Sequence, residues 1–251
     1  MVEANAEMQK YPEGLTANQE VLANLYAATK INAEVGRRRM LSSGKYELYK
    51  VTRPTSIFDF AQEDEFALKK HEKNIEDPLS PYYINQRNLP ANVYDQIGLV
   101  LKEIPSDVAP DFCTGIPKAG TDIAKAYSKA SGIPFLDDIF AKEQTGTGRK
   151  IVGKTEAREK KKLRIIDDLV TGADTKLEAI RAAEELGYEI TDIMVIIDRE
   201  EGGARELAKK GVKLYAAFKI TQLFDYYRRT GIIDIEKYKQ SMIYLIASQK
   251  K

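Results

Sequence analysis

The chain has 251 residues, which is enough to bury a full hydrophobic core and favours one domain with additions over two equal domains. Its 43% of hydrophobic and 31% of charged residues are typical of a globular protein and exclude a disordered chain. The 39 basic and 38 acidic residues give a net charge of +1. This balance provides no global attraction for nucleic acid or an anionic membrane, and we expect neither as a partner.

The chain has one cysteine and one histidine, which limits the disulfides, metal sites and nucleophiles that it can form. Cys113 is the only cysteine and His71 the only histidine, so an internal disulfide is excluded and a zinc site of Cys and His side chains is disfavoured. We expect Cys113 to be a packed thiol and not a nucleophile, because no histidine lies near it in sequence. The start of the chain lacks a signal-peptide pattern, and no apolar run approaches the roughly 18 residues of a membrane span. A soluble, cytoplasmic protein is expected.

The first part of the chain has mixed patterns. Apolar residues at helical spacing predict an amphipathic helix over 17–33, and the alternation in 45–51 predicts a strand. Residues 53–79 are charged, irregular and contain prolines, which indicates an inserted excursion around a short helix. Helical periodicity returns over 91–104, and Pro105 ends it.

From residue 105 onward, short apolar strands alternate with helices. This alternation is typical of a parallel sheet that is covered on both faces, and it predicts an α/β, doubly wound fold. The chain is expected to divide into residues 1–104, with an N-terminal helix and hairpin, and a core of residues 105–251 with C-terminal helices. Strands are expected at 108–114, 133–136, 163–166 and 190–197, and helices at 121–131, 175–186, 204–210, 220–230 and 235–247.

The most informative segment is LRIIDDLVTGADTKLEAI, residues 163–180. A buried strand ends in Asp167 and Asp168, and a turn of small residues leads directly into a helix. The turn and helix start present unpaired N–H groups to an anion such as phosphate, whereas carboxylates suit hydroxyl groups, Mg²⁺ or a developing positive charge. A ribose 5-phosphate satisfies both halves. In any α/β protein, however, the same residues could serve only as caps, with Asp168 in the turn and Thr175 at the helix.

This segment resembles the phosphoribosyl pyrophosphate (PRPP) signature of the type I phosphoribosyltransferases. The resemblance implies that the loop 171–175 wraps the 5-phosphate and that Asp167 and Asp168 hold the ribose hydroxyls. Ala173 or Asp174 stands where the loop of the family usually has glycine. The implied PRPP contacts in this segment are Asp167, Asp168, Leu169, Val170, Thr171, Gly172, Ala173, Asp174 and Thr175.

A second segment narrows the resemblance to orotate phosphoribosyltransferases. Residues 195–234 resemble the C-terminal portion of that family, including the Asp-Arg-x-x-Gly-Gly run that begins at Asp198. The resemblance places Arg199 on orotate, and a guanidinium suits the carboxylate that distinguishes orotate from uracil. Thr171 is also implied as an orotate contact. The alternative for Arg199 is an ordinary surface ion pair.

A third segment, residues 80–88 (SPYYINQRN), is similar to the base-binding hairpin of the family. The resemblance implies that Tyr83 and Ile84 contact the pyrimidine and makes the N-terminal part a base-binding hood. Lys69 matches the lysine that precedes this hairpin and is implied as a PRPP contact. Core packing is the alternative for the tyrosines, above all for Tyr82.

A fourth segment, CTGIPKAGTDIA at 113–124, is a glycine-containing turn between a strand and a helix. In the family, the corresponding loop contacts the pyrophosphate, which implies PRPP contacts from Lys118 and Ala119. As a generic feature such a turn is weak evidence, and its weight comes from the order of the motifs along the chain.

The fifth segment, residues 140–154, corresponds to the mobile loop of the family that closes over the pyrophosphate. Lys142 matches the lysine of that loop and is implied as a catalytic and PRPP-binding residue. Other basic residues of the family loop are missing, and Arg149 or Lys150 are candidates to supply the charge. The alternative is an ordinary solvated basic loop.

Together these motifs predict transfer of phosphoribosyl from PRPP to orotate, with Lys142, Asp167 and Asp168 as the catalytic residues. The resemblance implies Mg²⁺ as cofactor, bridging pyrophosphate and ribose oxygens with no side chain assigned as its ligand. It also implies a homodimer. Two alternatives stay open: a phosphoribosyltransferase for another base, and a non-catalytic regulator that binds PRPP.

Overall fold

The computed structural model describes residues 14–62, 65–67, 69–72, 74–137, 139–145, 148–153 and 161–249. Contacts divide these residues into two compact units. The first takes in the described residues up to Glu20 together with Pro90–Gln222, and the second takes in Val21–Leu89 and the chain from Leu223 onward. The functional division at residue 104 stays a prediction. In the described part of the chain, no helix is long and apolar enough to cross a membrane.

The first unit is built on a parallel sheet with the strand order β10-β9-β8-β5. Its strands are β5 (Phe112–Gly115), β8 (Lys162–Val170), β9 (Glu189–Asp198) and β10 (Lys213–Lys219). On the side of β5 away from β8, Phe135 forms a parallel bridge with Cys113. The chain therefore leaves β5 on one side and returns at β8 on the other, which makes a topological switch point between these two strands.

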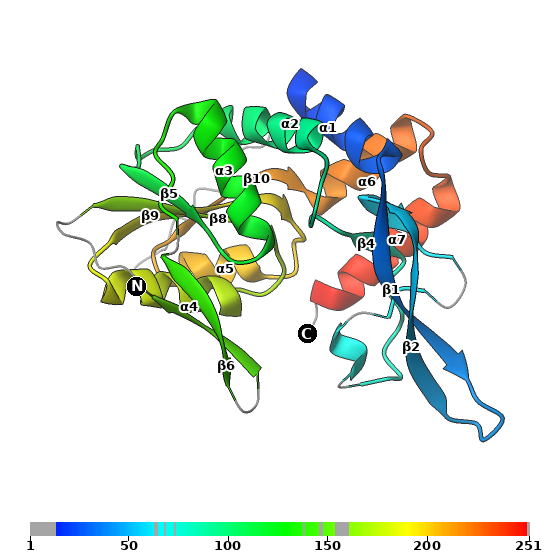
Figure 1. Ribbon diagram of the computed structural model, residues 1–251. Helices are drawn as coiled ribbons and strands as arrows, with labels where there is room; N and C mark the ends of the chain where they lie inside the picture. The colour runs from blue at the N-terminus through cyan, green and yellow to red at the C-terminus, as the bar shows by residue number, and fades with distance from the viewer. Residues whose placement is uncertain are drawn as a thin grey trace, which may run out of the picture. The chain divides into compact units, whose positions relative to one another are not determined.

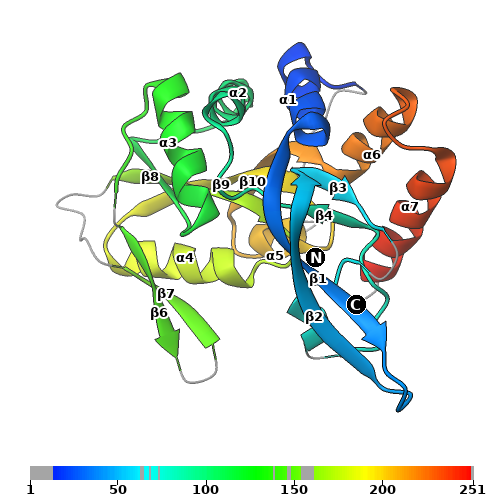
Figure 2. The ribbon, with the colours of Figure 1, turned by 45° about the vertical axis from the view of Figure 1, so that its right-hand side comes forward.

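Helices cover both faces of this sheet, as the doubly wound prediction requires. Figures 1 and 2 show α2 (Ala91–Lys102) and α3 (Ala119–Ser131) on one face, with α4 (Asp174–Glu185) and α5 (Gly203–Ala208) on the other. Most of the buried residues of β8 and β9 are apolar, as expected for strands that are covered on both faces. The predicted α/β class is confirmed.

An antiparallel hairpin, β6 (Phe140–Thr145) and β7 (Gly148–Gly153), stands where the sequence predicted a loop over 140–154. The pairing runs from Phe140 against Gly153 to Thr145 against Gly148. Phe140 and Ile151 are buried in the core cluster of the first unit, which anchors the base of the hairpin. The prediction of a loop was wrong for residues 140–145 and 148–153, because it rested on the resemblance and left these two apolar anchors out of account.

The second unit contains two antiparallel pairs, β1 (Lys30–Met40) with β2 (Tyr46–Ser56), and β3 (Phe58–Phe60) with β4 (Tyr82–Ile84). A short 3-10 helix, η1, spans Lys69–Glu72, and the C-terminal helix α7 spans Ile235–Gln249. Two further helices, α1 (Ala17–Ala28) and α6 (Ile220–Arg229), each run from one unit into the other.

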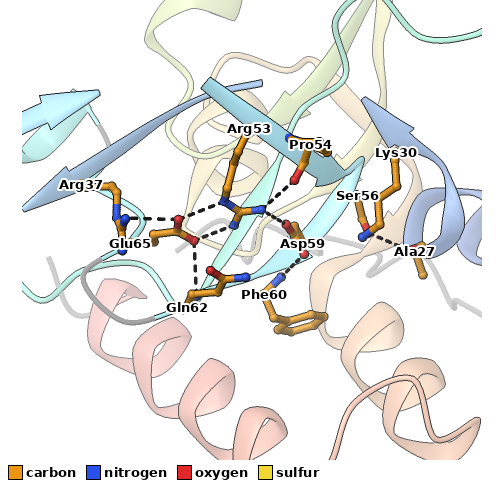
Figure 3. Close-up of polar contacts among 10 residues, drawn as sticks. All are labelled: Ala27, Lys30, Arg37, Arg53, Pro54, Ser56, Asp59, Phe60, Gln62 and Glu65. Carbon is orange, nitrogen blue, oxygen red and sulfur yellow. Dashed lines mark hydrogen bonds and ion pairs between the residues drawn. The ribbon is translucent and has the colours of Figure 1, made fainter. Parts of the chain in front are cut away.

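The expected excursion at 53–79 is partly ordered by an ion-pair network (Figure 3). Arg53 binds the carboxylate of Glu65 through two nitrogens, at 3.0 and 2.6 Å, and reaches Asp59 at 3.2 Å. Glu65 is only 3% exposed, so this guanidinium neutralises a buried charge. The prediction of irregular structure was wrong for the start of this range, where β2 continues to Ser56 and β3 follows.

Three other boundaries differ from the sequence prediction. The first helix ends at Ala28, because Ile31, Ala33 and Val35 alternate on one face of β1 and two of them are buried. Strand β10 was missed, and the strand expected at 133–136 is reduced to the bridge at Phe135. The remaining helices and strands from residue 91 onward were predicted at or near their observed positions.

A buried ion pair ties the middle of β8 to β9. Arg164 Nε and Nη2 lie 2.6 and 2.8 Å from the two carboxylate oxygens of Asp192, and Nη1 donates to the Tyr127 hydroxyl at 2.6 Å. Both charged side chains are about 2% exposed. Removing one partner of such a pair leaves an uncompensated charge in the core.

We therefore expect Arg164→Met to lower the free energy of unfolding by about 3–5 kcal/mol, as measured by urea denaturation. The double variant Arg164→Met, Asp192→Leu should recover most of this loss, because it removes both charges. The control is Lys129→Met, which breaks an exposed pair with Asp95 and should cost less than about 1 kcal/mol. Equal losses for Arg164→Met and Lys129→Met would contradict this account.

Candidate functional site

The predicted phosphate and ribose residues meet at the carboxyl edge of the parallel sheet. Strand β8 carries Asp167 and Asp168 near its end, and the loop 171–173 then leads into α4. This edge lies at the switch point between β5 and β8, where crevices form in open α/β sheets. The fold therefore places both carboxylates where a ligand of such a sheet binds.

Asp167 is held by a lysine that the sequence analysis did not single out. Lys176 Nζ lies 2.8 Å from Asp167 Oδ2 and donates to the Leu169 carbonyl oxygen at 2.5 Å. Lys176 and Asp167 are both 6% exposed. The two groups form a buried ion pair between the end of β8 and the first turn of α4.

Asp168 is partly buried and has a different environment. Its Oδ1 accepts a hydrogen bond from the Leu169 N–H at 2.8 Å. Burial, followed by the charge of Asp167, raises the pKa of Asp168 to about 7, and Lys176 opposes this rise. This carboxyl group is therefore close to its proton-binding equilibrium at neutral pH, and it can accept from or donate to a hydroxyl group.

The loop at 171–173 presents the start of α4 to solvent. Gly172, Asp174 and Thr175 are exposed, and the first turn of a helix leaves N–H groups without intrahelical acceptors. These N–H groups suit a phosphate. The Asp174 side chain is exposed to solvent, which weakens its repulsion of an anion at the helix start. The binding of a phosphate at this helix start stays a prediction.

The Gly-Gly run after Arg199 packs directly on this loop. Gly203 N–H donates to the Thr171 carbonyl oxygen at 2.8 Å. A Cβ on Gly203 would lie 2.4 Å from Val170 Cγ2 and 2.6 Å from the Thr171 oxygen, so no larger residue fits there. Gly203 thus holds the segment that begins at Asp198 against the loop at 171–173.

The loop between β5 and α3 approaches the acidic pair from the other side. A Cβ on Gly120 would lie 2.6 Å from the Ile166 carbonyl oxygen and 3.0 Å from Asp167 Oδ1. Lys118 is exposed on this loop and Ala119 is buried at the start of α3. The first turn of α3, at Gly120, and the first turn of α4, at Lys176, therefore both approach the Asp167 carboxylate.

Arg199 follows the end of β9 beside the same loop. Its N–H donates to the Val170 carbonyl oxygen at 3.0 Å, and its Nη2 lies 2.8 Å from Glu201 Oε1. The Arg199 side chain is 13% exposed, so it is not an ordinary solvated surface arginine. Arg199, the predicted orotate contact, thus lies at the same carboxyl edge of the sheet as Asp167 and Asp168, and it has Glu201 as an ion-pair partner.

The other predicted residues belong to the second unit or have side chains outside the described part of the structure. Tyr83 and Ile84 are on β4 in the second unit, where Tyr83 stacks on Phe66 with ring centroids 5.1 Å apart. Tyr82 is 1% exposed, so the core-packing alternative is confirmed for this residue. Among the basic candidates, the backbones fall in η1 or in the β6–β7 hairpin, and the side chains lie outside the described part of the structure: Lys69, Lys142, Arg149 and Lys150.

Cys113 is buried, as predicted. Its Sγ lies 3.8 Å from the Ala124 carbonyl oxygen, and burial raises the pKa of the thiol to about 12. A thiol with this pKa carries almost no thiolate at neutral pH, which disfavours a nucleophilic role.

The sequence does contain a signal for Lys176. It shares the buried face of α4 with Ala179, Ile180 and Ala183, at the helical spacing of three, four and seven residues. A lysine on a buried helical face needs a buried acid, and two aspartates end the preceding strand. The signal was available but was not used.

Comparison with curated proteins places this arrangement in context, although no protein-family model matches the chain. The chain is 31% identical over 153 residues to the orotate phosphoribosyltransferase of Aquifex aeolicus, covering 58% of this chain and 82% of the relative. It is 32% identical over 150 residues to the orotate phosphoribosyltransferase of Pyrococcus furiosus, covering 58% and 81%.

Solved structures share the fold. The UMP synthase of Leishmania donovani superposes with a TM-score of 0.61 at 25% identity, over 76% of this chain, and the chain spans 40% of that longer protein. The orotate phosphoribosyltransferase of Mycobacterium tuberculosis in complex with PRPP superposes with a TM-score of 0.51 at 18% identity, over 82% of this chain and 98% of that one.

The raised pKa of Asp168 predicts a stability effect that depends on pH. Above the ordinary value of 3.8, the folded protein holds this proton more tightly than the unfolded chain, so the stability linked to it is lost as the pH rises through 7. Asp168→Asn cannot ionise. The free energy of unfolding of this variant relative to the wild type should therefore rise by about 2–4 kcal/mol between pH 4 and pH 8.

The measurement is urea denaturation of both proteins at several pH values. Asp174→Asn is the matched control, because Asp174 is exposed at the start of α4 and should show no comparable rise. A difference between wild type and Asp168→Asn that does not change with pH would contradict the assignment.

Proposed function

Because the chain belongs to the orotate phosphoribosyltransferase family, we propose that it transfers the phosphoribosyl group of PRPP to orotate. The products are orotidine 5'-phosphate and pyrophosphate, which makes the reaction a step of pyrimidine nucleotide biosynthesis. In the reaction, a ring nitrogen of orotate loses its proton and forms a bond to C1 of the ribose, while the bond from C1 to the pyrophosphate oxygen breaks and its electron pair leaves with pyrophosphate.

The observation that carries this proposal is the meeting of two carboxylates with a helix start at one edge of the sheet. In the proposed complex, the N–H groups of residues 171–175 bind the 5-phosphate. Asp168 binds a ribose hydroxyl, and Asp167 lies next to it at the end of β8. A ligand with a phosphate beside a diol satisfies these donors and acceptors together, so the reacting carbon is held in place.

Base recognition is assigned to Arg199 at the end of β9, together with Thr171. The guanidinium would bind the orotate carboxylate, and this contact has a purpose only for a base that carries a carboxylate. It therefore favours orotate over uracil and the purines as substrate. Tyr83 and Ile84 stay proposed contacts of the pyrimidine, on the basis of the resemblance.

The leaving pyrophosphate needs positive charge as the bond to C1 breaks, because the transition state has oxocarbenium character. We propose that Lys118, together with Ala119 at the start of α3, binds the pyrophosphate in the ground state. Lys69 is a further proposed contact. Lys142 is proposed to stabilise the negative charge that develops on the leaving pyrophosphate. Mg²⁺ is proposed to arrive as a chelate of PRPP, with substrate oxygens as its ligands. The described residues contain no group of three or more His, Cys, Asp or Glu side chains that could hold a metal ion by themselves.

Two further parts of the proposal concern the setting of the enzyme. We propose that it works in the cytoplasm as a homodimer, as the resemblance implies. A mixed dimer of Lys142→Ala and Asp167→Asn subunits should regain activity at one site if Lys142 reaches the active site of the partner subunit.

The direct test is an assay of the purified chain with Mg²⁺ and PRPP against orotate, uracil, adenine and hypoxanthine. The proposal expects pyrophosphate release and nucleotide formation with orotate alone. Turnover of another base in preference to orotate would identify a different phosphoribosyltransferase, and binding of PRPP without turnover of any base would identify a non-catalytic relative.

Arg199→Ala should weaken orotate binding by about 2–5 kcal/mol, because it removes a partly buried cation from the carboxylate site. The affinity for Mg²⁺–PRPP should change little. Calorimetric titration of each ligand checks this, with Arg181→Ala on the exposed face of α4 as a control that should bind both ligands normally. Equal losses for the two ligands would contradict a direct contact with the carboxylate.

Lys142→Ala should lower kcat much more than it weakens binding of either substrate. A group that acts mainly on the leaving pyrophosphate contributes in the transition state, so kcat and kcat/KM should fall together. Arg149→Ala should have a smaller effect of the same kind. Steady-state kinetics with Lys129→Met as the surface control would measure this, and wild-type turnover in Lys142→Ala would remove the hairpin from the mechanism.

A further inference from the structure

The ion pair with Lys176 gives Asp167 an environment different from that of Asp168, the other aspartate of the predicted ribose site. Asp167 is 6% exposed and its carboxylate lies 2.8 Å from Lys176 Nζ, whereas Asp168 is partly buried and has the N–H of Leu169 as a neighbour. A carboxylate that is buried and committed to a lysine is a poor acceptor for a ligand hydroxyl. The adjacent Asp168 is better placed for that contact.

The ion pair also lies between the two loops proposed to bind PRPP. On one side, Gly120 packs so closely that a Cβ there would lie 3.0 Å from Asp167 Oδ1. On the other side, Lys176 sits in the first turn of α4, immediately after the loop at 171–175. Its second hydrogen bond, to the Leu169 carbonyl oxygen at 2.5 Å, fixes that turn to the last residues of β8.

We propose that Lys176 is a positioning residue: through its ion pair with Asp167 it fixes the phosphate loop at 171–175 against the pyrophosphate loop at 115–120, and Asp168 alone of the two aspartates contacts the ribose. This inference rests on the proposed function, because it assigns PRPP to these loops. It predicts that Asp167 and Lys176 act as one unit in PRPP binding, although neither touches the ligand.

The coupling between a buried charge and its partner is large enough to be measured as a change in PRPP affinity. If both side chains serve only to hold the loops, breaking the ion pair from either side should misplace the same loops by the same amount. A displacement of this kind in a binding site typically reduces function by about tenfold to a hundredfold. The losses from the two substitutions should then not add.

The experiment is a double-mutant cycle on the full chain, read by calorimetric titration with Mg²⁺–PRPP and by the KM for PRPP against kcat. The variants are Lys176→Met, Asp167→Asn and the double variant, with Lys176→Arg as the conservative change and Lys129→Met as the surface control. We expect each single variant to weaken PRPP binding about tenfold or more and to raise the KM for PRPP more than it lowers kcat. Lys176→Arg should regain most of the affinity, and Lys129→Met should match the wild type.

The double variant decides between the interpretations. An affinity equal to that of each single variant supports the positioning role. Losses that add would show that Asp167 contacts the ligand independently, and a return to wild-type affinity would show that Lys176 only neutralises a buried acid; either result overturns the inference. Wild-type PRPP affinity in a folded Lys176→Met variant would also overturn it.

Folding is checked by thermal melting, because Lys176→Met leaves a buried carboxylate without its cation. If that variant does not fold, the double variant still tests the inference, since it carries neither charge. Its PRPP affinity should equal that of Asp167→Asn, and a tenfold weaker affinity would overturn the positioning role. If the wild type binds PRPP but turns over no base, the proposed function fails while the cycle still tests Lys176; if it binds no PRPP, both fail.

Discussion

Two adjacent carboxyl groups, Asp167 and Asp168, lie near the end of β8 in a sheet that helices cover on both faces. The rest of the site depends on how the negative charge of these two groups is stabilised. Asp167 and Asp168 cannot both be ionised and buried without a cation nearby. Lys176 supplies that cation at 2.8 Å for Asp167, and burial together with the neighbouring charge raises the pKa of Asp168 to about 7. The two aspartates are thus chemically different although they are adjacent in sequence.

Close backbone contacts bring the other motifs to this edge. Gly120 and Gly203 lie where any side chain would collide with β8 or with the loop that follows it, so both neighbouring loops approach within van der Waals distance. Lys118 lies two residues before Gly120, and the backbone N–H of Arg199 donates to the Val170 carbonyl oxygen at the end of β8. A PRPP molecule and an incoming base with a carboxylate would use groups from three places: the loop at 115–120, the end of β8 with the loop at 171–175, and Arg199.

The features that depend on local pattern were predictable, and those that depend on distant pairing were not. The apolar run of β8, its terminal aspartates and the helix that follows could be read directly, because neighbouring residues determine them. Strand β1 was hidden because Ile31 continues a helical spacing as well as an alternating one. The ion pair between Arg53 and Glu65 joins residues that are twelve positions apart, and no local pattern predicts it. Lys176 lay on a predictable helical face after two strand-end aspartates, but which aspartate it pairs with became evident only when β8 and α4 were placed together.

We propose that the carboxyl edge between β5 and β8 binds the phosphoribosyl ligand. Backbone amide chemical shifts of the ¹⁵N-labelled chain, recorded by NMR during titration with Mg²⁺–PRPP, test this claim residue by residue. We expect saturable shifts that are largest at the amides of residues 172–175 and 118–120. Saturable binding that leaves these amides unshifted and moves only resonances of other segments, such as the β1–β2 hairpin, would contradict the proposal.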